Sequence, residues 1–223
     1  MNLISTFCFL STFALLPFPG CGAKSTTSIS AGHFHTCALE QRQGVDVSGA
    51  LRCWGQNKFG QASPPAGIFQ QVSSGQVFSC AIGLDTKVQC WGQIGGTPSH
   101  RGFKQVSAGK SHACALENNG RIHCWGRRDH GETDAPDEQY SQVSSGTSNT
   151  CAIRFDGTVN CWGKYYGPNE MSPPKEKFKE ISVGSKHRAC GITTKDNIKC
   201  WGSLDGSDLG EIQEGELNMY SLL

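Results

Sequence analysis

The chain has 223 residues, enough for one sizeable domain or two small ones. Its 20 Lys and Arg residues nearly balance 19 Asp and Glu residues, and the formal net charge of +1 gives no electrostatic argument for binding nucleic acid. A mean hydropathy of −0.37 argues against a bundle of membrane helices, and 28 glycines favour an all-β fold of short strands.

The first 23 residues differ from the rest of the chain because they carry no charged side chain. Their apolar stretch, about residues 7–18, is too short to span a bilayer but suits the core of a secretory signal. The small residues Cys21 and Ala23 fit cleavage after Ala23, so we expect a signal peptide over residues 1–23 and a mature chain over residues 24–223. Two alternatives remain open, a lipid-modified Cys21 and an uncleaved N-terminal anchor, and either would hold the protein at a membrane surface.

The triplet Cys-Trp-Gly occurs five times and contains all five tryptophans of the chain. The triplets lie at residues 53–55, 90–92, 124–126, 161–163 and 200–202, with spacings of 37, 34, 37 and 39 residues. Each follows a segment similar to FKQVSAGKSHACAL of residues 103–116. A period near 37 without helical periodicity indicates repeated β units, and the array leaves no room for a second domain.

The ten cysteines of the mature chain form five pairs, four of them ten positions apart: Cys37/Cys53, Cys80/Cys90, Cys114/Cys124, Cys151/Cys161 and Cys190/Cys200. In the third pair, placing the two cysteines opposite each other also places Leu116 opposite Ile122. Residues 118–120 then form a three-residue loop with Gly120 in the third place, where such hairpins need a left-handed residue. The spacing therefore predicts one cross-strand disulfide in each hairpin.

Residues two places inside the cysteines share the disulfide's face, and we expect this face to be buried between neighbouring units. A disulfide closing such a loop contributes roughly 3 kcal/mol and requires an oxidising compartment, in agreement with a secretory signal. Gly157 and Asp196 suit the third loop position, whereas Thr86 fits it poorly and predicts a different turn. The first hairpin has six extra residues around 41–47, which form either a binding finger or a tolerated surface insertion.

The repeated V-S-x-G-x-x-H-x-C-A-L and G-x-V-x-C-W-G patterns, with GQNKFGQASPP of Gly55–Pro65, resemble the RCC1/BLIP-II superfamily of β-propeller repeats. The paired cysteines are most similar to those of CRINKLY4-type receptor kinase ectodomains, and the resemblance covers about residues 25–210. It implies four-stranded blades around a central axis, usually seven. Five repeats imply a five-bladed propeller, an incomplete ring or a ring completed by self-association. We expect residues 215–223, GELNMYSLL, to be strand-like and able to close the ring beside the first repeat.

The sequence offers little for catalysis, metals or cofactors. The CxxC and HxxxH spacings typical of zinc sites do not occur, so no metal site and no cofactor are expected. His35, His112 and His187 share one repeat position that holds Phe78 and Asn149 in other repeats, which favours packed or turn-capping histidines over ligands. Every cysteine of the mature chain has a predicted partner, and no residue stands apart as a nucleophile, so we do not expect an enzyme.

Binding residues are expected in the segments that follow Cys-Trp-Gly, because these vary between repeats while the hairpins do not. Arg and aromatic side chains are enriched at protein interfaces, so the candidate contacts are Phe59, Arg127, Arg128, Tyr165 and Tyr166. The tryptophans point away from the disulfide face and are predicted to pack against the next unit, with stacking on a sugar as the alternative.

The sequence therefore predicts a secreted or cell-surface, non-enzymatic β-propeller that binds an extracellular or surface protein. A lectin-like propeller that binds a glycan is one alternative. The RCC1 resemblance also implies a guanine-nucleotide exchange factor, but a signal peptide and ten paired cysteines argue against a cytosolic or nuclear location. No nucleic acid is expected as a partner, and a membrane is expected only through Cys21 or an uncleaved anchor.

Overall fold

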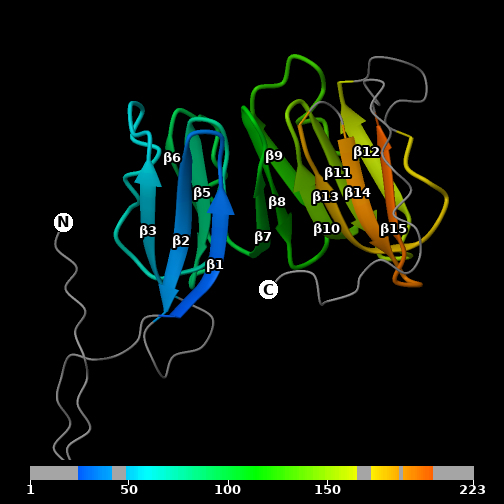
Figure 1. The fold of residues 1–223 in the computed structure, drawn as a ribbon, viewed down its shortest axis with the longest axis horizontal. Coiled ribbons are helices and arrows are strands. Elements are labelled where there is room, and N and C mark those ends of the chain that lie inside the picture. The colour runs from blue at the N-terminus through cyan, green and yellow to red at the C-terminus, as the bar shows by residue number, and fades with distance from the viewer. Residues whose placement is uncertain (1–24, 42–48, 165–171, 186–187, 203–223) are drawn as a thin grey trace, which may run out of the picture.

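Each of the five repeats folds into one antiparallel sheet of three strands. The computed structural model describes residues 25–41, 49–164, 172–185 and 188–202, and its sheets follow one another in chain order (Figure 1). No described residue lies in a helix, so this part of the chain contains no helix that crosses a bilayer.

We number the sheets 1 to 5, and in each the second strand lies between the first and the third. Their strands are β1 (Ser25–Ala31), β2 (His35–Gln41) and β3 (Ala50–Gly55); β4 (Phe69–Ser74), β5 (Phe78–Gly83) and β6 (Val88–Gly92); β7 (Phe103–Ala108), β8 (His112–Glu117) and β9 (Ile122–Gly126); β10 (Tyr140–Ser145), β11 (Asn149–Arg154) and β12 (Val159–Gly163); β13 (Phe178–Val183), β14 (Arg188–Thr193) and β15 (Ile198–Gly202).

The hairpin register predicted from the cysteine spacing is confirmed. Cys114 lies opposite Cys124, and Leu116 lies opposite Ile122. Gly120 takes a left-handed conformation with φ +90° in the third place of the loop. All five predicted disulfides are present: Cys37–Cys53, Cys80–Cys90, Cys114–Cys124, Cys151–Cys161 and Cys190–Cys200. Each repeat is thus one stapled hairpin with a further strand at its edge.

The expectation of a different turn at Thr86 is wrong. Gly83 N donates to Lys87 O at 3.0 Å and Thr86 N donates to Gly83 O at 2.9 Å, which is the hydrogen-bonding pattern of the glycine-containing hairpins. Thr86 adopts a left-handed φ of 60°. Its Oγ1 donates to Asp85 O at 2.7 Å and accepts from Gly102 N at 3.1 Å, and these bonds hold the hydroxyl in place. Hydrogen bonds to the following segment therefore hold a conformation that is uncommon for a β-branched residue.

The four-stranded blades implied by the family resemblance are not seen among the described residues, where each sheet has three strands. The described connections after β3 and β6, residues 56–68 and 93–102, contain no strand. The first of them contains Pro64 and Pro65, which cannot donate to a β ladder.

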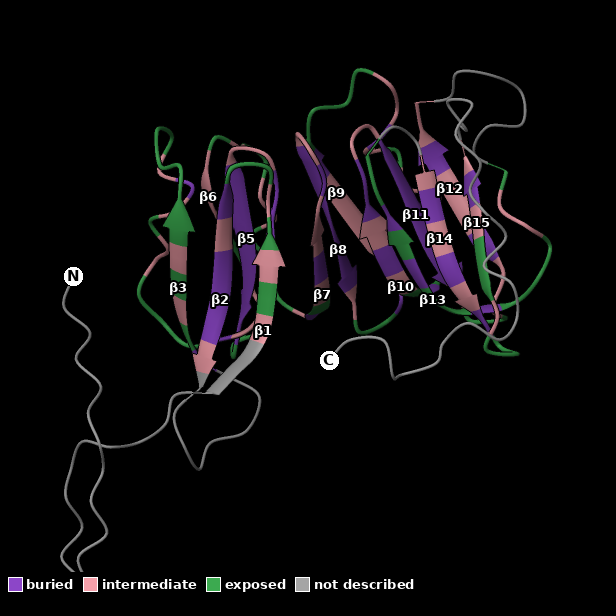
Figure 2. Cartoon of the chain, in the orientation of Figure 1, coloured by how far each residue is buried: buried purple, intermediate pink, exposed green. Residues whose placement is uncertain are grey.

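Neighbouring sheets pack face to face, with the disulfide face of one against the tryptophan face of the next. Between sheets 2 and 3 the buried side chains include Cys80, Ile82, Val88, Phe103, Val106 and Trp125. Figure 2 shows the resulting buried layer along the central strands β5, β8 and β11. The tryptophan therefore packs against the preceding sheet, and the prediction that it packs against the next one is wrong. The hairpin fixes which face a side chain takes, but not which neighbour that face meets.

Hydrogen bonds join the first strands of neighbouring sheets. Gln105 donates from Nε2 to Val143 O and accepts on Oε1 from Val143 N, both at 3.0 Å. Two residues later, Ser107 Oγ accepts from Ser145 N at 2.9 Å. Equivalent bonds to the following sheet are made by Ser30, Gln71, Ser73, Gln142 and Ser144. The repeated Q-V-S pattern thus links one sheet to the next.

The repeated glycines permit close backbone contact. A Cβ on Gly109 would lie 2.3 Å from Gly146 O in the next sheet, so no other residue fits without moving the first strands of the two sheets apart. Gly126 of the third Cys-Trp-Gly triplet has φ +99°, and a Cβ there would lie 2.7 Å from Ser111 O. Arg127 N donates to the same oxygen at 2.9 Å. The glycine after tryptophan therefore turns the chain across the start of its own hairpin, at the residue before β8.

The outer faces of the first and last sheets are more exposed than the faces between sheets. In sheet 1, Ile29 is 64% and Trp54 48% exposed. In sheet 5, Ile198 is 38% exposed, and Glu180 and Ser182 make no hydrogen bond to another sheet within the part of the chain that the structure describes. The described sheets thus form an array with two exposed end faces. The predicted closing segment, residues 215–223, lies outside the described residues.

Candidate binding surfaces

The first strands of all five sheets end around a central cavity of about 230 Å³. Each sheet contributes the last residue of its first strand and the glycine that follows, and every sheet except sheet 2 also contributes the next residue. The lining is mostly backbone and small side chains, and the half-buried Lys110 is the longest side chain among the described lining residues. The cavity is therefore an axial space with exposed peptide groups, without the convergent titratable groups of a catalytic site.

The connections after β3 and β9 are held by two buried polar residues that sequence analysis missed. Gln61 is fully buried, and its Oε1 accepts from Phe59 N at 2.8 Å. Its backbone oxygen accepts from Trp91 Nε1 at 2.8 Å, which ties the connection to the next sheet. Glu132 plays the same part, with its Oε2 accepting from His130 N at 2.7 Å. The only signal in the sequence is the recurring Gly before each, at residues 60 and 131.

The predicted contact residues Phe59, Arg127 and Arg128 are all exposed on these connections, which lie at the same end of their sheets (Figure 1). They come from sheets 1 and 3 and are separated by sheet 2, so they do not form one continuous patch. Lys58 Nζ lies 5.6 Å from the Phe59 ring centre, and Arg127 Nε pairs with Asp129 Oδ2 at 2.6 Å. Tyr165 and Tyr166 lie outside the described residues, as do residues 42–48, which include most of the extended first hairpin loop.

The outer face of sheet 1 forms a shallow apolar depression of about 340 Å³, lined by Ile29, Ala38, Glu40, Arg52 and Trp54. Arg52 Nη1 pairs with Glu40 Oε1 at 3.2 Å at its edge. In sheets 3, 4 and 5 the tryptophan equivalent to Trp54 is only 6% exposed, because the preceding sheet covers it. The five tryptophans are equivalent in the sequence but not in their exposure. We call the outer apolar face of sheet 1, which contains Trp54, the sheet 1 face.

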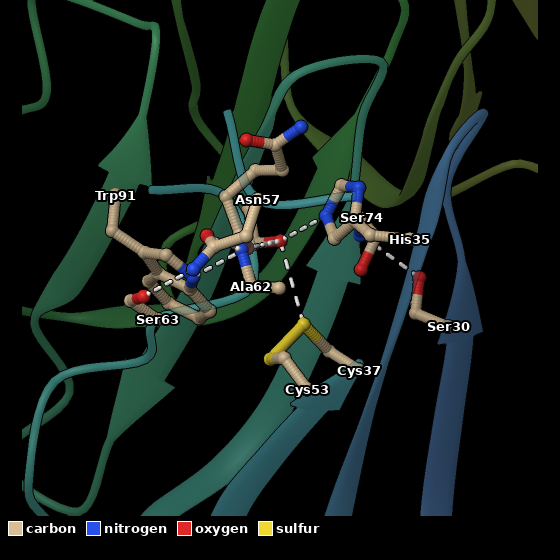
Figure 3. The surroundings of a disulfide bond; sticks show 11 residues. Ser30, His35, Cys37, Cys53, Asn57, Ala62, Ser63, Ser74 and Trp91 are labelled. Carbon is tan, nitrogen blue, oxygen red and sulfur yellow. Dashed lines mark hydrogen bonds between the residues drawn. A yellow bond between two sulfur atoms is a disulfide. The ribbon is translucent and has the colours of Figure 1, made fainter. Parts of the chain in front are cut away.

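The repeated histidines are packed between sheets, as predicted. His35 Nε2 shares a 2.6 Å hydrogen bond with Ser79 Oγ of sheet 2, beside the Cys37–Cys53 disulfide (Figure 3). His112 Nε2 shares a 2.9 Å bond with Thr150 Oγ1 of sheet 4. Burial lowers the pKa of His35, and it lowers the pKa of His112 to about 4. Both rings are therefore neutral at physiological pH, while His187 lies outside the described residues.

A cluster of two histidines and one glutamate is formed by residues that no sequence motif connects. His100, from the connection before β7, meets Glu117 and His123 of the β8–β9 hairpin. The three residues are 17 and 6 positions apart along the chain, so no zinc pattern of short spacing predicts them. The fold alone brings these side chains together.

Comparisons with known proteins agree with the repeats. Residues 103–132 and 140–164 match the model of the Regulator of chromosome condensation (RCC1) repeat. No curated protein is significantly similar in sequence. The crystal structure of the CRINKLY WD40 ectodomain of the Arabidopsis thaliana receptor kinase ACR4 is similar, with TM-score 0.68 and 25% identity, over 86% of this chain and 71% of that one.

The ectodomain of the Physcomitrella patens receptor kinase CR4 has TM-score 0.68 and 27% identity, over 86% of this chain and 54% of its own. Prp20p from Saccharomyces cerevisiae, with TM-score 0.64 and 15% identity over 80% of this chain and 57% of its own, shares the fold alone. The chain thus spans about half to about seven tenths of the length of these proteins. It is an all-β array of RCC1-like repeats, similar to CRINKLY4 ectodomains and carrying one disulfide in each repeat.

Proposed function

We propose that this RCC1-like array is a secreted or cell-surface module without catalytic activity that binds a partner protein through the sheet 1 face. The observation that carries the proposal is the contrast between Trp54, 48% exposed, and its buried equivalents in sheets 3 to 5. Exposed aromatic side chains beside aliphatic ones are typical of protein interfaces.

The interfaces inside the chain indicate what such a partner presents. Four times, a sheet's tryptophan face is covered by a neighbouring sheet with aliphatic side chains around a disulfide. The sheet 1 face resembles these covered tryptophan faces, because it contains Ile29, Ala38 and Trp54. We therefore expect the partner to offer a β-sheet with an aliphatic face, and a carboxylate near the exposed Arg52.

The extracellular location rests on the cysteines. All ten cysteines of the described residues are paired in disulfides, and disulfides of this density persist in oxidising compartments. The similarity to receptor kinase ectodomains supports the same location. The signal peptide over residues 1–23 and the alternative lipid site at Cys21 lie outside the described residues and belong to this proposal. Mass spectrometry of the exported protein distinguishes the two. A chain that starts at Lys24 supports the signal peptide, and a lipid-sized mass increment on Cys21 supports lipidation.

Binding is tested on cells of the source organism with fluorescently labelled, disulfide-intact protein. Trp54→Arg is expected to weaken saturable binding about 30-fold, because losing a buried interface tryptophan costs about 2 kcal/mol or more. Leu84→Arg is the matched control, since Leu84 is 60% exposed in a hairpin turn of sheet 2, away from this face. Protease treatment of the cells should abolish binding, whereas glycosidase treatment should not.

Other outcomes contradict parts of the proposal. Equal binding by the Trp54 and Leu84 variants means that the sheet 1 face is not the contact site. Binding that resists protease but is lost after glycosidase supports the lectin alternative, in which the exposed Trp54 indole stacks on a sugar. A wild-type dimer that becomes a monomer in the Trp54 variant, seen by light scattering, identifies a second copy of this chain as the occupant.

A further inference from the structure

We propose that His100, Glu117 and His123 form a Zn²⁺ site on the surface of sheet 3. Two imidazoles and one carboxylate converge there, although the sequence predicted no metal site. This inference is independent of the proposed function because the three residues lie outside the sheet 1 face.

The geometry is close to that of a zinc centre. His100 Nε2 lies 2.7 Å and His123 Nε2 3.0 Å from the same Glu117 Oε1, and the three ligand atoms lie within 4.8 Å of one another. Zinc bonds of about 2.0–2.1 Å in a tetrahedron separate ligand atoms by roughly 3.4 Å. Binding therefore needs only small movements, in which the carboxylate oxygen withdraws slightly from each imidazole nitrogen.

The surroundings hold the three ligands in place. Phe103 is fully buried beneath the imidazoles, with its ring centre 4.7 Å from that of His100 and 5.9 Å from that of His123. Asn119 Nδ2 donates to Glu117 Oε2 at 2.7 Å, which orients the carboxylate and leaves Oε1 for the metal. The two imidazole side chains are 45% and 43% exposed, so water reaches the fourth coordination position.

Comparison with the other repeats argues against a general packing role. The position of His123, directly before the second cysteine of each hairpin, holds Arg52, Gln89, Asn160 and Lys199 in the other sheets. In sheet 1 the corresponding carboxylate pairs with arginine, as Glu40 with Arg52. Sheet 3 has the carboxylate but replaces the guanidinium, which cannot bind a metal, with two imidazoles, which can. Nitrogen ligands of this kind favour Zn²⁺ over Ca²⁺ or Mg²⁺.

The metal would connect two segments that otherwise meet through few bonds. His100 belongs to the connection from sheet 2, and Glu117 and His123 belong to the hairpin of sheet 3. Asn118 N already donates to Gly102 O at 2.8 Å beside the site. Zinc would therefore fix this connection to the hairpin and present an open coordination position at the surface.

The test uses the full mature protein with intact disulfides and no polyhistidine tag. Titration with ZnCl₂ in a calorimeter should give one ion per chain. The double variant His100→Ala, His123→Ala should weaken binding at least 100-fold, and Glu117→Gln should weaken it about tenfold. His33→Ala is the control, because the exposed His33 lies in sheet 1 outside the cluster. Co²⁺ in place of Zn²⁺ should give the intense visible absorption of a tetrahedral site.

Two results would overturn the proposal. One is wild-type protein that binds no Zn²⁺ at millimolar concentration, which would show that the three side chains are only a hydrogen-bonded group. The other is binding that is unchanged in the double variant, which would place the metal elsewhere. Near-ultraviolet circular dichroism of each variant verifies the fold, so that lost binding reports lost ligands.

Discussion

Replacing equivalent tryptophans in different sheets measures whether the sheet 1 face is uncovered in solution. Trp125→Ala removes a side chain that is 6% exposed and packed against sheet 2, whereas Trp54→Ala removes one that is 48% exposed. The two tryptophans occupy the same repeat position. Trp125 Nε1 makes no hydrogen bond among the described residues, so its loss reports packing alone.

The expected difference follows from the exposed fractions. A tryptophan has a surface of up to about 250 Å², so the 42-point difference between 48% and 6% corresponds to roughly 105 Å². At about 25 cal/mol per Å² this amounts to about 2.6 kcal/mol. Since Trp→Ala in a core costs about 3–5 kcal/mol, subtracting this difference leaves about 0.4–2.4 kcal/mol for Trp54→Ala.

The assay is equilibrium unfolding in urea with the disulfides intact, which mass spectrometry verifies. The midpoint should fall more in the Trp125 variant than in the Trp54 variant, while the slope with urea stays the same. Equal destabilisation by the two substitutions would refute the reasoning, because it would mean that another part of the protein or a second copy covers Trp54 in solution.

Two further predictions concern the interior of the array. Replacing Cys114 and Cys124 by alanine should lower the free energy of unfolding by about 2.7 kcal/mol, the loop-entropy value for a separation of ten residues, and calorimetry that finds no change would contradict it. His112 takes up a proton readily only when unfolded, because its folded pKa of about 4 lies below the ordinary histidine value of 6.5, so stability should be lost as pH falls from 6.5 to 4, by up to about 3 kcal/mol. His112→Asn, which installs the residue that sheet 4 has at this position, should flatten this part of the pH profile measured by urea titration, and an unchanged profile would show that other groups cause it.

The hairpins could be predicted because their contacts are local. Cys114 and Cys124 are ten residues apart, and a strand alternates its faces every residue, so one pairing fixed the register of the whole hairpin. The prediction at Thr86 was wrong because it considered only the residue in the turn. The Thr86 hydroxyl accepts a hydrogen bond from Gly102 N, which belongs to the next segment.

The surfaces were less predictable because each depends on how one sheet meets another. The exposed Phe59, Arg127 and Arg128 were expected from the variable connections, yet the fold separates them. Gln61 and Glu132 were missed because a single polar residue in a turn-rich segment gives no sign of being buried. The convergence of His100 with Glu117 and His123 was missed because no local spacing records it.

Residues within one repeat encode the hairpin, its disulfide, its aliphatic face and the recurring glycines, since these features depend on strand alternation and local spacing. Packing between sheets sets which neighbour each face meets, which tryptophan stays exposed and which distant side chains converge. The contacts between sheets join residues far apart in the chain, such as His35 and Ser79, which are 44 positions apart. The geometry of these contacts follows from how neighbouring sheets are stacked. Similar repeats have similar sequences whether they lie inside the array or at its end, so the same repeat position can be buried in one sheet and exposed in another.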